Sequence, residues 1–268
     1  MLWKIFKKWK KTLQTLSDVR FAQKIPYYSF RLKEFFNTND MNLKIIAFDA
    51  DDTLFVNETY FEETEKKFCN LMSDYLSSQS LSQELLKTQV TNLPLYGYGI
   101  KGYVLSMIET AIQVSEGTIS AKGIAKITEL GKELIQKPIE LLDGVEETLA
   151  ALHGQYKLVV ATKGDLKDQQ RKLHDSGLGH YFHHIEVMSD KQEINYEKLL
   201  KRLEIESSEF FMIGNSLKSD VLPVLNIGGH AAHVPFHTTW EHEKIDYKIV
   251  HPNFTALEKI IDVLPYLL

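Results

Sequence analysis

Residues 44–55, KIIAFDADDTLF, join an apolar run directly to a group of carboxylates. The first part, IIAF at 45–48, is typical of a short strand that is buried on both faces. Asp49, Asp51 and Asp52 follow it within four positions. Ionised carboxylates resist burial unless a cation or hydrogen-bond donors compensate their charge. The end of this strand is therefore either a solvent-exposed turn or a site that holds a metal ion.

Further apolar runs of strand length recur along the chain, and helix-length segments separate the later ones. The runs are KIIAFDA (44–50), YKLVVAT (156–162), HIEVM (184–188), FFMIGNS (210–216) and GHAAHVP (229–235). The segments between them include VEETLAALH (145–153), LKDQQRKLHDSG (166–177), NYEKLLKRLEI (195–205) and SDVLPVLNIGG (219–229). Strands that alternate with helices form a parallel sheet covered by helices. The sequence thus predicts an α/β fold with a doubly wound parallel sheet.

The interval between the first and second runs is too long for a single crossover helix. It carries two sets of apolar residues at helical spacing. One set is Phe61, Phe68, Leu71, Met72, Tyr75 and Leu76, and the other is Val104, Leu105, Ile108, Ala111 and Ile112. We therefore expect an inserted helical domain at 57–138 and a core domain made of 41–56 and 139–268.

Residues 1–40 differ from the rest of the chain in their charge. They hold nine Lys and Arg against three Asp and Glu, whereas the whole chain holds 31 and 36. Aromatic and aliphatic residues recur there at roughly helical spacing with lysines between them, as in LWKIFKKWKK at 2–11. A basic amphipathic helix of this kind can bind an anionic membrane surface or a protein partner. The alternative is an additional helix that packs on the protein's own core.

The composition is typical of a globular protein, since 44% of the 268 residues are hydrophobic and 25% are charged. No apolar run is long enough to cross a membrane, and lysines occupy the N-terminal positions where a signal peptide needs apolar residues. The single cysteine, Cys69, excludes an internal disulfide and suits a reducing compartment. We expect a cytoplasmic protein that binds no nucleic acid.

Polar side chains follow the predicted strands at the point where each one ends. They are Asp49, Asp51 and Thr53 after the first strand, Thr162 and Lys163 after the second, Lys191 after the third, and Asn215, Ser216 and Asp220 after the fourth. Because ligands of open parallel sheets lie at the carboxyl ends of the strands, we expect these side chains to share one crevice. The combination suits phosphoryl transfer, in which positioning and charge neutralisation dominate. Mg²⁺ would then compensate the carboxylates.

Four of these segments resemble, in the same order, the motifs of the haloacid dehalogenase-like phosphohydrolase superfamily. DADDT (49–53) is similar to its DxDxT loop, and VVATKGD (159–165) to its second motif, a strand that ends in Thr or Ser. SDKQEINYEKLL (189–200) resembles the third motif, and IGNSLKSD (213–220) resembles the fourth, GDxxxxD. The resemblance covers about residues 40–250. It implies that the helical insertion is a cap domain that closes over the active site.

The resemblance also implies a role for each matched residue in the hydrolysis of a small phosphomonoester. Asp49 would be the nucleophile that forms an aspartyl-phosphate, and Asp51 would protonate the leaving alkoxide and then activate water. Thr162 would donate a hydrogen bond to the transferring phosphoryl group, and Lys191 would hold both that group and Asp49. The Mg²⁺ ligands would be Asp49, the main-chain carbonyl of Asp51, Asn215 and, directly or indirectly, Asp220.

Two positions depart from the family pattern. Asp52 stands where glycine is usual, and we expect it to be a solvated turn residue. Asn215 stands where aspartate is usual, which removes one negative charge from the expected metal site. This departure supports an alternative function, a catalytically degenerate binding or scaffolding protein that acts through its basic N-terminal extension. Asp51 argues against a dehalogenase, because dehalogenase relatives lack the second aspartate of the first motif.

Other features of the sequence have competing interpretations. LYGYGIKGY (95–103) predicts either a flexible aromatic loop that contacts substrate or a tight turn between helices. Lys101 within it suggests the Schiff-base chemistry of phosphonate-cleaving relatives, although nothing around it predicts a lowered pKa. Two histidine clusters suggest zinc, but no cysteine or carboxylate completes either set at ligand spacing, so we expect surface and packing roles for them. These clusters are His180, His183 and His184, and His230, His233 and His237.

Overall fold

The computed structural model describes residues 42–268, which form an α/β fold around one six-stranded parallel sheet. Residues 1–41, and with them the predicted amphipathic extension, lie outside the described residues. The strand order is β3-β2-β1-β4-β5-β6. The strands are β1 (Ile45–Phe48), β2 (Lys157–Lys163), β3 (His184–Met188), β4 (Phe210–Gly214), β5 (His230–His233) and β6 (Phe254–Ala256). The first predicted strand is thus at the centre of the sheet, between β2 and β4.

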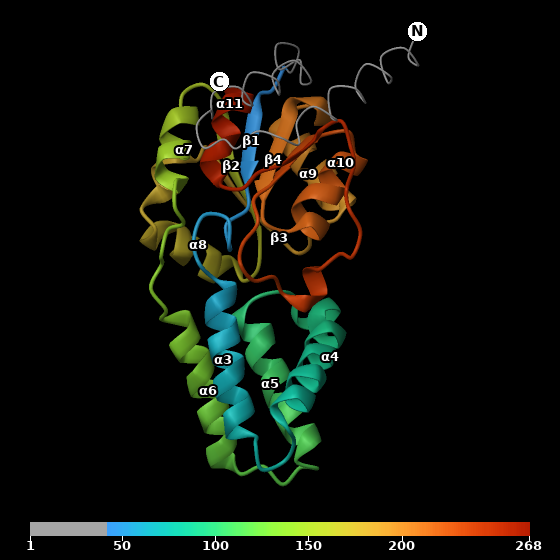
Figure 1. Cartoon of the computed structure of the whole chain (residues 1–268). Coiled ribbons are helices and arrows are strands. Elements are labelled where there is room, and N and C mark those ends of the chain that lie inside the picture. The colour runs from blue at the N-terminus through green and yellow to red at the C-terminus, as the bar shows by residue number, and fades with distance from the viewer. Residues whose placement is uncertain (1–41) are drawn as a thin grey trace, which may run out of the picture. The chain divides into compact units, whose positions relative to one another are not determined.

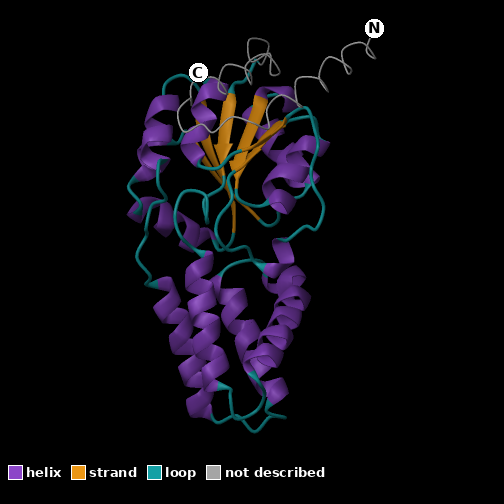
Figure 2. Ribbon diagram, in the orientation of Figure 1, coloured by secondary structure: helices purple, strands orange, loops and turns teal. Residues whose placement is uncertain are grey.

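Helices cover both faces of this sheet, as Figure 2 shows. They are α7 (Val145–Leu152), α8 (Leu166–Asp175), α9 (Glu193–Leu203), α10 (Leu222–Asn226) and α11 (Leu264–Leu267). Shorter turns are 3₁₀ helices at Leu178–Tyr181, Ser207–Glu209, Glu241–Glu243 and Ile260–Val263, and a π-helical turn at Leu217–Val221. This arrangement confirms the doubly wound parallel sheet that the alternating runs predict.

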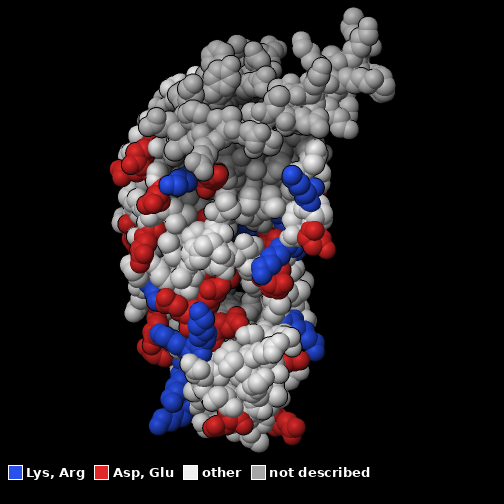
Figure 3. All heavy atoms as spheres, in the orientation of Figure 1, with Lys and Arg blue, Asp and Glu red and all other residues white. Residues whose placement is uncertain are grey.

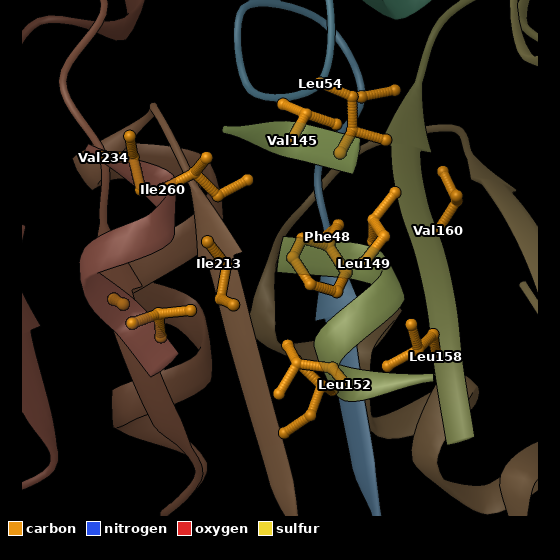
Figure 4. Close-up of a cluster of buried hydrophobic side chains, with 14 of the residues drawn as sticks. Phe48, Leu54, Val145, Leu149, Leu152, Leu158, Val160, Ile213, Val234 and Ile260 are labelled. Atoms are coloured by element: carbon orange, nitrogen blue, oxygen red, sulfur yellow. The ribbon is translucent and has the colours of Figure 1, made fainter. Parts of the chain in front are cut away.

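The side chains of β1 alternate between two apolar clusters, which is why all four of its residues are buried. Ile46 and Phe48 point to the first cluster, where they pack with Val145, Leu149 and other residues (Figure 4). Ile45 and Ala47 point to the opposite face and pack in the second cluster with α9 and α10. A strand that is buried on both faces has an apolar residue at every position, and this explains the unbroken IIAF run.

Four long helices between β1 and α7 form a unit of their own, which we call the helical unit (Figure 1). They are α3 (Glu58–Leu71), α4 (Ser78–Tyr96), α5 (Ile100–Val114) and α6 (Ala121–Ile135). Their apolar faces build a third cluster around Phe68, Leu85 and Met107, each of which is fully buried. The Ser77 and Ser120 side chains cap the N-termini of α4 and α6 by accepting main-chain hydrogen bonds.

The chain crosses between the sheet and the helical unit twice, and the two crossings are hydrogen-bonded to each other. The amide of Val56 donates to the Glu140 carbonyl at 2.9 Å, and the amide of Leu142 donates to the Leu54 carbonyl at 3.0 Å. Phe55 and Leu141 pair between them as antiparallel partners. The two connections therefore form a short antiparallel ribbon, which we call the connecting ribbon.

Of the two alternatives for 95–103, the structure has the tight turn between helices, because α4 continues to Tyr96 and α5 begins at Ile100, and the Tyr103 side chain is buried. One other expectation from the sequence is wrong. Asp52 is only 5% exposed, so it is not a solvated turn residue. With φ at +60°, its carboxylate accepts hydrogen bonds from the amides of Asn57 and Glu58 at 2.8 and 3.0 Å and thereby caps α3. The burial of Asp52 is explained by these donors.

Within residues 42–268, none of the helices is long and apolar enough to span a bilayer. The helix expected at 219–229 is split into the π-helical turn Leu217–Val221 and α10. β6 has no counterpart among the predicted strands, since it is only three residues long and lies at the edge of the sheet beside β5.

Candidate active site

The carboxyl ends of the central strands meet in a pocket that contains every residue predicted for a catalytic or metal-binding role. This edge pocket holds about 600 Å³ of empty space, which includes space open to solvent. Its lining includes Asp49, Asp51, Thr162, Lys191, Asn215 and Asp220. Parallel strands bring their carboxyl ends to one edge of the sheet, so residues far apart in the sequence meet there.

Lys191 joins Asp49 and Asp220 at the bottom of the edge pocket. Its ammonium donates to Oδ1 of Asp49 and, at 2.6 Å, to Oδ1 of Asp220. All three side chains are buried, with Lys191 only 3% exposed. Burial raises the pKa of Asp49 to about 7, although the charge of Lys191 acts in the opposite direction. Burial also disfavours the Lys191 ammonium, but the charges of Asp220 and Asp49 outweigh it and raise the pKa of Lys191.

Gly214 allows Asp220 to approach the end of β4. A Cβ atom at position 214 would lie 2.2 Å from Oδ2 of Asp220, which is closer than any side chain can tolerate. The same oxygen accepts a hydrogen bond from the Ser216 amide at 2.9 Å. Both oxygens of Asp220 therefore have donors in the protein, and this residue is fixed by contacts on each side.

Asp51 is held by a different set of donors. Lys172 donates to its Oδ1 at 2.5 Å and Gln169 to its Oδ2 at 2.8 Å, and both residues come from α8. The Lys172 side chain is buried, whereas that of Asp51 is 23% exposed. The carboxylates of Asp49 and Asp51 thus have separate cationic partners, although they are two residues apart.

The Asn215 side chain lies among oxygen atoms of the first motif. One terminal atom of its amide is 3.1 Å from the main-chain oxygen of Asp51 and 3.2 Å from Oδ2 of Asp49. At these distances the amide nitrogen can donate to both oxygens, or the amide oxygen can join them around a cation. Hard oxygen donors of this kind suit Mg²⁺. Among residues 42–268 no three His, Cys, Asp or Glu side chains gather as metal ligands, so such a site depends on the amide and main-chain oxygens.

Thr162 and Lys163 end β2. Lys163 pairs there with Glu243, a residue that the sequence did not predict for the site. Thr162 is 1% exposed, and its hydroxyl donates to the Lys163 carbonyl at 3.4 Å. The Lys163 ammonium donates to Ser219 at 2.8 Å and to Glu243 at 2.6 Å. Burial raises the pKa of Glu243, but the charge of Lys163 and hydrogen bonds from Lys163, Ser216 and Ser219 bring it to about 2.

A second pocket lies between α3, α4 and α5 of the helical unit and the residues that follow β2, and we call it the helix-side pocket. It holds about 920 Å³ of empty space, including space open to solvent. Asp51, Asn57, Glu58, Tyr98, Lys163 and Trp240 line both this pocket and the edge pocket. Asp51 therefore stands at the boundary between them. Figure 3 shows acidic and basic side chains side by side at the level where the helical unit meets the sheet.

The lysine and the histidines that suggested Schiff-base or zinc chemistry make other contacts in the structure. Lys101 is exposed and forms an ion pair with Asp165 at 3.0 Å. His183 accepts a hydrogen bond from the Leu158 amide at 3.2 Å, and His233 lies 2.9 Å from the Asn215 carbonyl. These contacts are of the packing kind expected for the histidines.

A family model described as haloacid dehalogenase-like hydrolase matches residues 43–228. The crystal structure of a haloacid dehalogenase-like family hydrolase from Xanthomonas campestris is similar to this one, with a TM-score of 0.75 and 37% sequence identity. The match covers 85% of this chain and 91% of that one. The glyceraldehyde 3-phosphate phosphatase of Pyrococcus abyssi is 26% identical over 69% of this chain and 79% of its own length. The pyrimidine 5'-nucleotidase YjjG of Escherichia coli is 26% identical over 68% and 82%.

Proposed function

Because this chain belongs to the haloacid dehalogenase-like hydrolases, we propose that it is a Mg²⁺-dependent phosphatase that hydrolyses a small phosphomonoester through an aspartyl-phosphate. The observation that carries the proposal is the arrangement of Asp49, Lys191 and Asp51. The buried carboxylate of Asp49 pairs with the buried ammonium of Lys191 in the edge pocket. Asp51 lies at the boundary with the helix-side pocket. Turnover of p-nitrophenyl phosphate and of a panel of phosphomonoesters, with and without Mg²⁺, tests it.

In the proposed reaction, Asp49 attacks the phosphorus atom and the bond from phosphorus to the leaving oxygen breaks. Lys191 holds Oδ1 of Asp49 and so fixes the orientation of the carboxylate before the attack. Water then attacks the phosphorus of the aspartyl-phosphate, which releases inorganic phosphate and restores Asp49. Thr162 and Lys191 line the same pocket and would donate hydrogen bonds to the phosphoryl oxygens.

Asp51 is suited to move the proton in both steps, because it lies where the phosphate and the leaving group would meet. It would protonate the leaving oxygen and then accept a proton from the attacking water. Lys172 and Gln169 hold both of its oxygens and thereby orient the carboxylate. We assign these two residues of α8 a positioning role.

Mg²⁺ would supply positive charge that neutralises the phosphoryl oxygens and the carboxylates of the site. Asp49, the main-chain oxygen of Asp51 and the amide oxygen of Asn215 would hold it. Asp220 would support the site indirectly, since its oxygens already accept hydrogen bonds from Lys191 and the Ser216 amide.

The helical unit would act as the cap domain of this enzyme. Its residues form one wall of the helix-side pocket, opposite residues that follow β2. A leaving group bound there is enclosed between the two, which favours a small metabolite over a phosphorylated macromolecule.

Replacing Asp51 by asparagine should slow hydrolysis to a degree that depends on the leaving group. For an alkyl phosphate, whose leaving oxygen needs a proton, we expect kcat to fall by about 10²- to 10⁴-fold. For p-nitrophenyl phosphate, whose leaving group is stable as an anion, the loss should be much smaller. Steady-state kinetics on 2-hydroxyethyl phosphate and p-nitrophenyl phosphate measure the difference. Equal losses on the two substrates would rule out proton donation by Asp51.

Replacing Asn215 by aspartate should lower the Mg²⁺ concentration that gives half-maximal activity by about tenfold, which corresponds to about 1.4 kcal/mol. An added carboxylate binds a hard cation more strongly than a neutral amide does. The measurement is a Mg²⁺ titration of turnover after treatment with a chelator. Asn70→Asp adds the same charge on the exposed part of α3 and serves as the control.

The same titration separates the phosphatase from the alternative of a degenerate binding protein. A phosphatase shows wild-type turnover that depends on Mg²⁺, whereas a degenerate protein shows neither turnover nor stabilisation by Mg²⁺. Full activity after chelation would contradict the role proposed for Asn215 in both cases.

A further inference from the structure

Two carboxylates in the helix-side pocket lack partners. Glu58 and Glu65 both lie on α3 and line this pocket. Among residues 42–268, neither side chain forms an ion pair or accepts a hydrogen bond. Burial, followed by the charges of Asp52, Glu62 and Glu65, raises the pKa of Glu58 to about 8. A carboxyl with this pKa is largely protonated at pH 7 and ionises when a cation binds beside it, so the pocket offers two carboxyl groups that no described residue neutralises.

The remaining charged groups of the pocket are already paired. Asp165 pairs with Lys101 at 3.0 Å, and Asp168 pairs with Arg171 at 2.8 Å. Lys172 pairs with Asp51 at 2.5 Å. The last charged group, Lys163, is held by Glu243 at 2.6 Å. Since each of these charges is balanced, Glu58 and Glu65 determine the charge that a bound group must carry.

Two residues that line this pocket also carry buried polar atoms without hydrogen-bond partners among the described residues. These atoms are the hydroxyl of Tyr103, which is 6% exposed, and Oε1 of Gln169, which is 2% exposed. Tyr103 lies close enough to Glu65 and Glu58 that their charges, after burial, help to raise the pKa of its hydroxyl. Buried polar atoms of this kind normally have partners, so their presence points to a ligand that supplies hydrogen-bond donors.

Aromatic rings complete the lining around these acceptors. Phe61 packs against Tyr103 with ring centroids 5.1 Å apart, and Trp240 packs against Tyr98 at 6.3 Å. All four residues line the pocket. Carboxylates, an acceptor oxygen and aromatic faces are the groups that bind organic ammonium ions.

We propose that the leaving group of the substrate carries a positively charged ammonium, so that the substrate class is the phosphomonoesters of amino alcohols. This inference rests on the proposed function for its turnover, while the charge preference of the pocket stands on the contacts above. The phosphate would lie in the edge pocket, the scissile oxygen at Asp51, and the ammonium between Glu58 and Glu65. Breaking the bond from phosphorus to the alcohol oxygen and adding water would release the free amino alcohol and inorganic phosphate.

Charge separates this class from the alternatives. A neutral polyol or nucleoside could satisfy Tyr103 and Gln169 by hydrogen bonding, but it would leave both glutamates uncompensated. An acidic leaving group would be repelled by them. The preference is therefore expected to follow the charge of the leaving group rather than its size.

Two ligands of nearly equal size test the inference, 2-aminoethyl phosphate and 2-hydroxyethyl phosphate. Their binding to the Asp49→Asn protein is measured by calorimetry, and their kcat/KM values are measured on the wild-type protein. We expect the amine to bind at least tenfold more tightly and to react with at least tenfold higher kcat/KM. p-Nitrophenyl phosphate is assayed in parallel as a substrate without an ammonium.

Glu65→Gln should remove most of this preference, because kcat/KM and binding should fall for 2-aminoethyl phosphate and not for 2-hydroxyethyl phosphate. The control is Glu63→Gln, which removes the same charge from the exposed side of α3, where Glu63 pairs with Lys137. It should keep the full preference for the amine. A merely structural role of Glu65 would lower the turnover of all three phosphate esters together.

The outcomes distinguish the two proposals. If p-nitrophenyl phosphate is hydrolysed but the two ethyl phosphates bind equally, the ammonium pocket is wrong and the phosphatase stands. If no ester is hydrolysed but the amine binds more tightly and Glu65→Gln removes the difference, the phosphatase is wrong and the ammonium pocket stands. Equal binding in both Glu65 forms overturns the pocket whatever the turnover.

Discussion

Asp49→Asn should lower kcat for every phosphomonoester by at least about 10⁴-fold, because the amide cannot form the aspartyl-phosphate. The substitution changes few atoms, and Lys191 keeps Asp220 as its partner at 2.6 Å. Loss of activity should therefore not be accompanied by unfolding. Steady-state assays on a preparation purified away from other phosphatases, together with thermal denaturation, measure both effects.

Asp49→Asn should also change the pH dependence of the protein's stability. Burial raises the pKa of Asp49 from 3.8 to about 7 in the folded protein, so the folded state holds this proton more tightly than the unfolded state does. Ionising Asp49 therefore costs stability as the pH rises from about 4 to about 7. Asparagine has no such cost, and in metal-free buffer above pH 7 the variant should melt at a temperature equal to or higher than wild type. Near wild-type turnover by Asp49→Asn would exclude the covalent mechanism.

Lys191→Met should abolish turnover and also destabilise the fold. Its ammonium is the shared partner of Asp49 and Asp220, and all three groups are buried. Removing one member of a buried ion-pair set leaves uncompensated charge and costs about 3–5 kcal/mol in the free energy of unfolding. Urea denaturation at pH 7 measures this change, and the phosphatase assay measures the loss of activity.

Lys198→Met is the matched control, since Lys198 lies on α9 in the same segment of the chain but is exposed. It should leave both quantities nearly unchanged. If Lys191→Met unfolded at the same urea concentration as the control, the network of Lys191 with two carboxylates would not contribute to stability in the way that its burial implies.

The central sheet and the meeting of six candidate site residues at one of its edges could be predicted from the sequence for the same reason. A strand buried on both faces has no polar position, so the run at 45–48 is unambiguous, and the residues after each such strand must meet at one edge. Asp49, Lys191 and Asp220 are far apart in the sequence, but this rule places them together. The structure brings them within hydrogen-bond distance.

Residues that reach the site from helices and irregular segments could not be predicted. Lys172 and Gln169 lie in LKDQQRKLHD, which has the appearance of a polar surface helix, and nothing in that pattern shows that both are buried against Asp51. Glu243 belongs to a 3₁₀ turn after β5, where no periodicity marks it. For 95–103 the sequence left a loop and a tight turn between helices open, and it did not show that Gly102 and Tyr103 lie inside α5. Tertiary contacts determine the positions of these residues, and local patterns do not record them.

The connecting ribbon has a mechanical consequence for the helical unit. Two strands hydrogen-bonded to each other bend more easily across their plane than within it, so we expect any movement of the helical unit to be a rotation about one axis. Asp52 adds a second constraint. It belongs to the same loop as Asp49 and Asp51, and its carboxylate accepts hydrogen bonds from main-chain amides at the start of α3. Any swing of α3 therefore pulls on that loop. Movement of the helical unit to admit a substrate would therefore be coupled to the positions of Asp49 and Asp51.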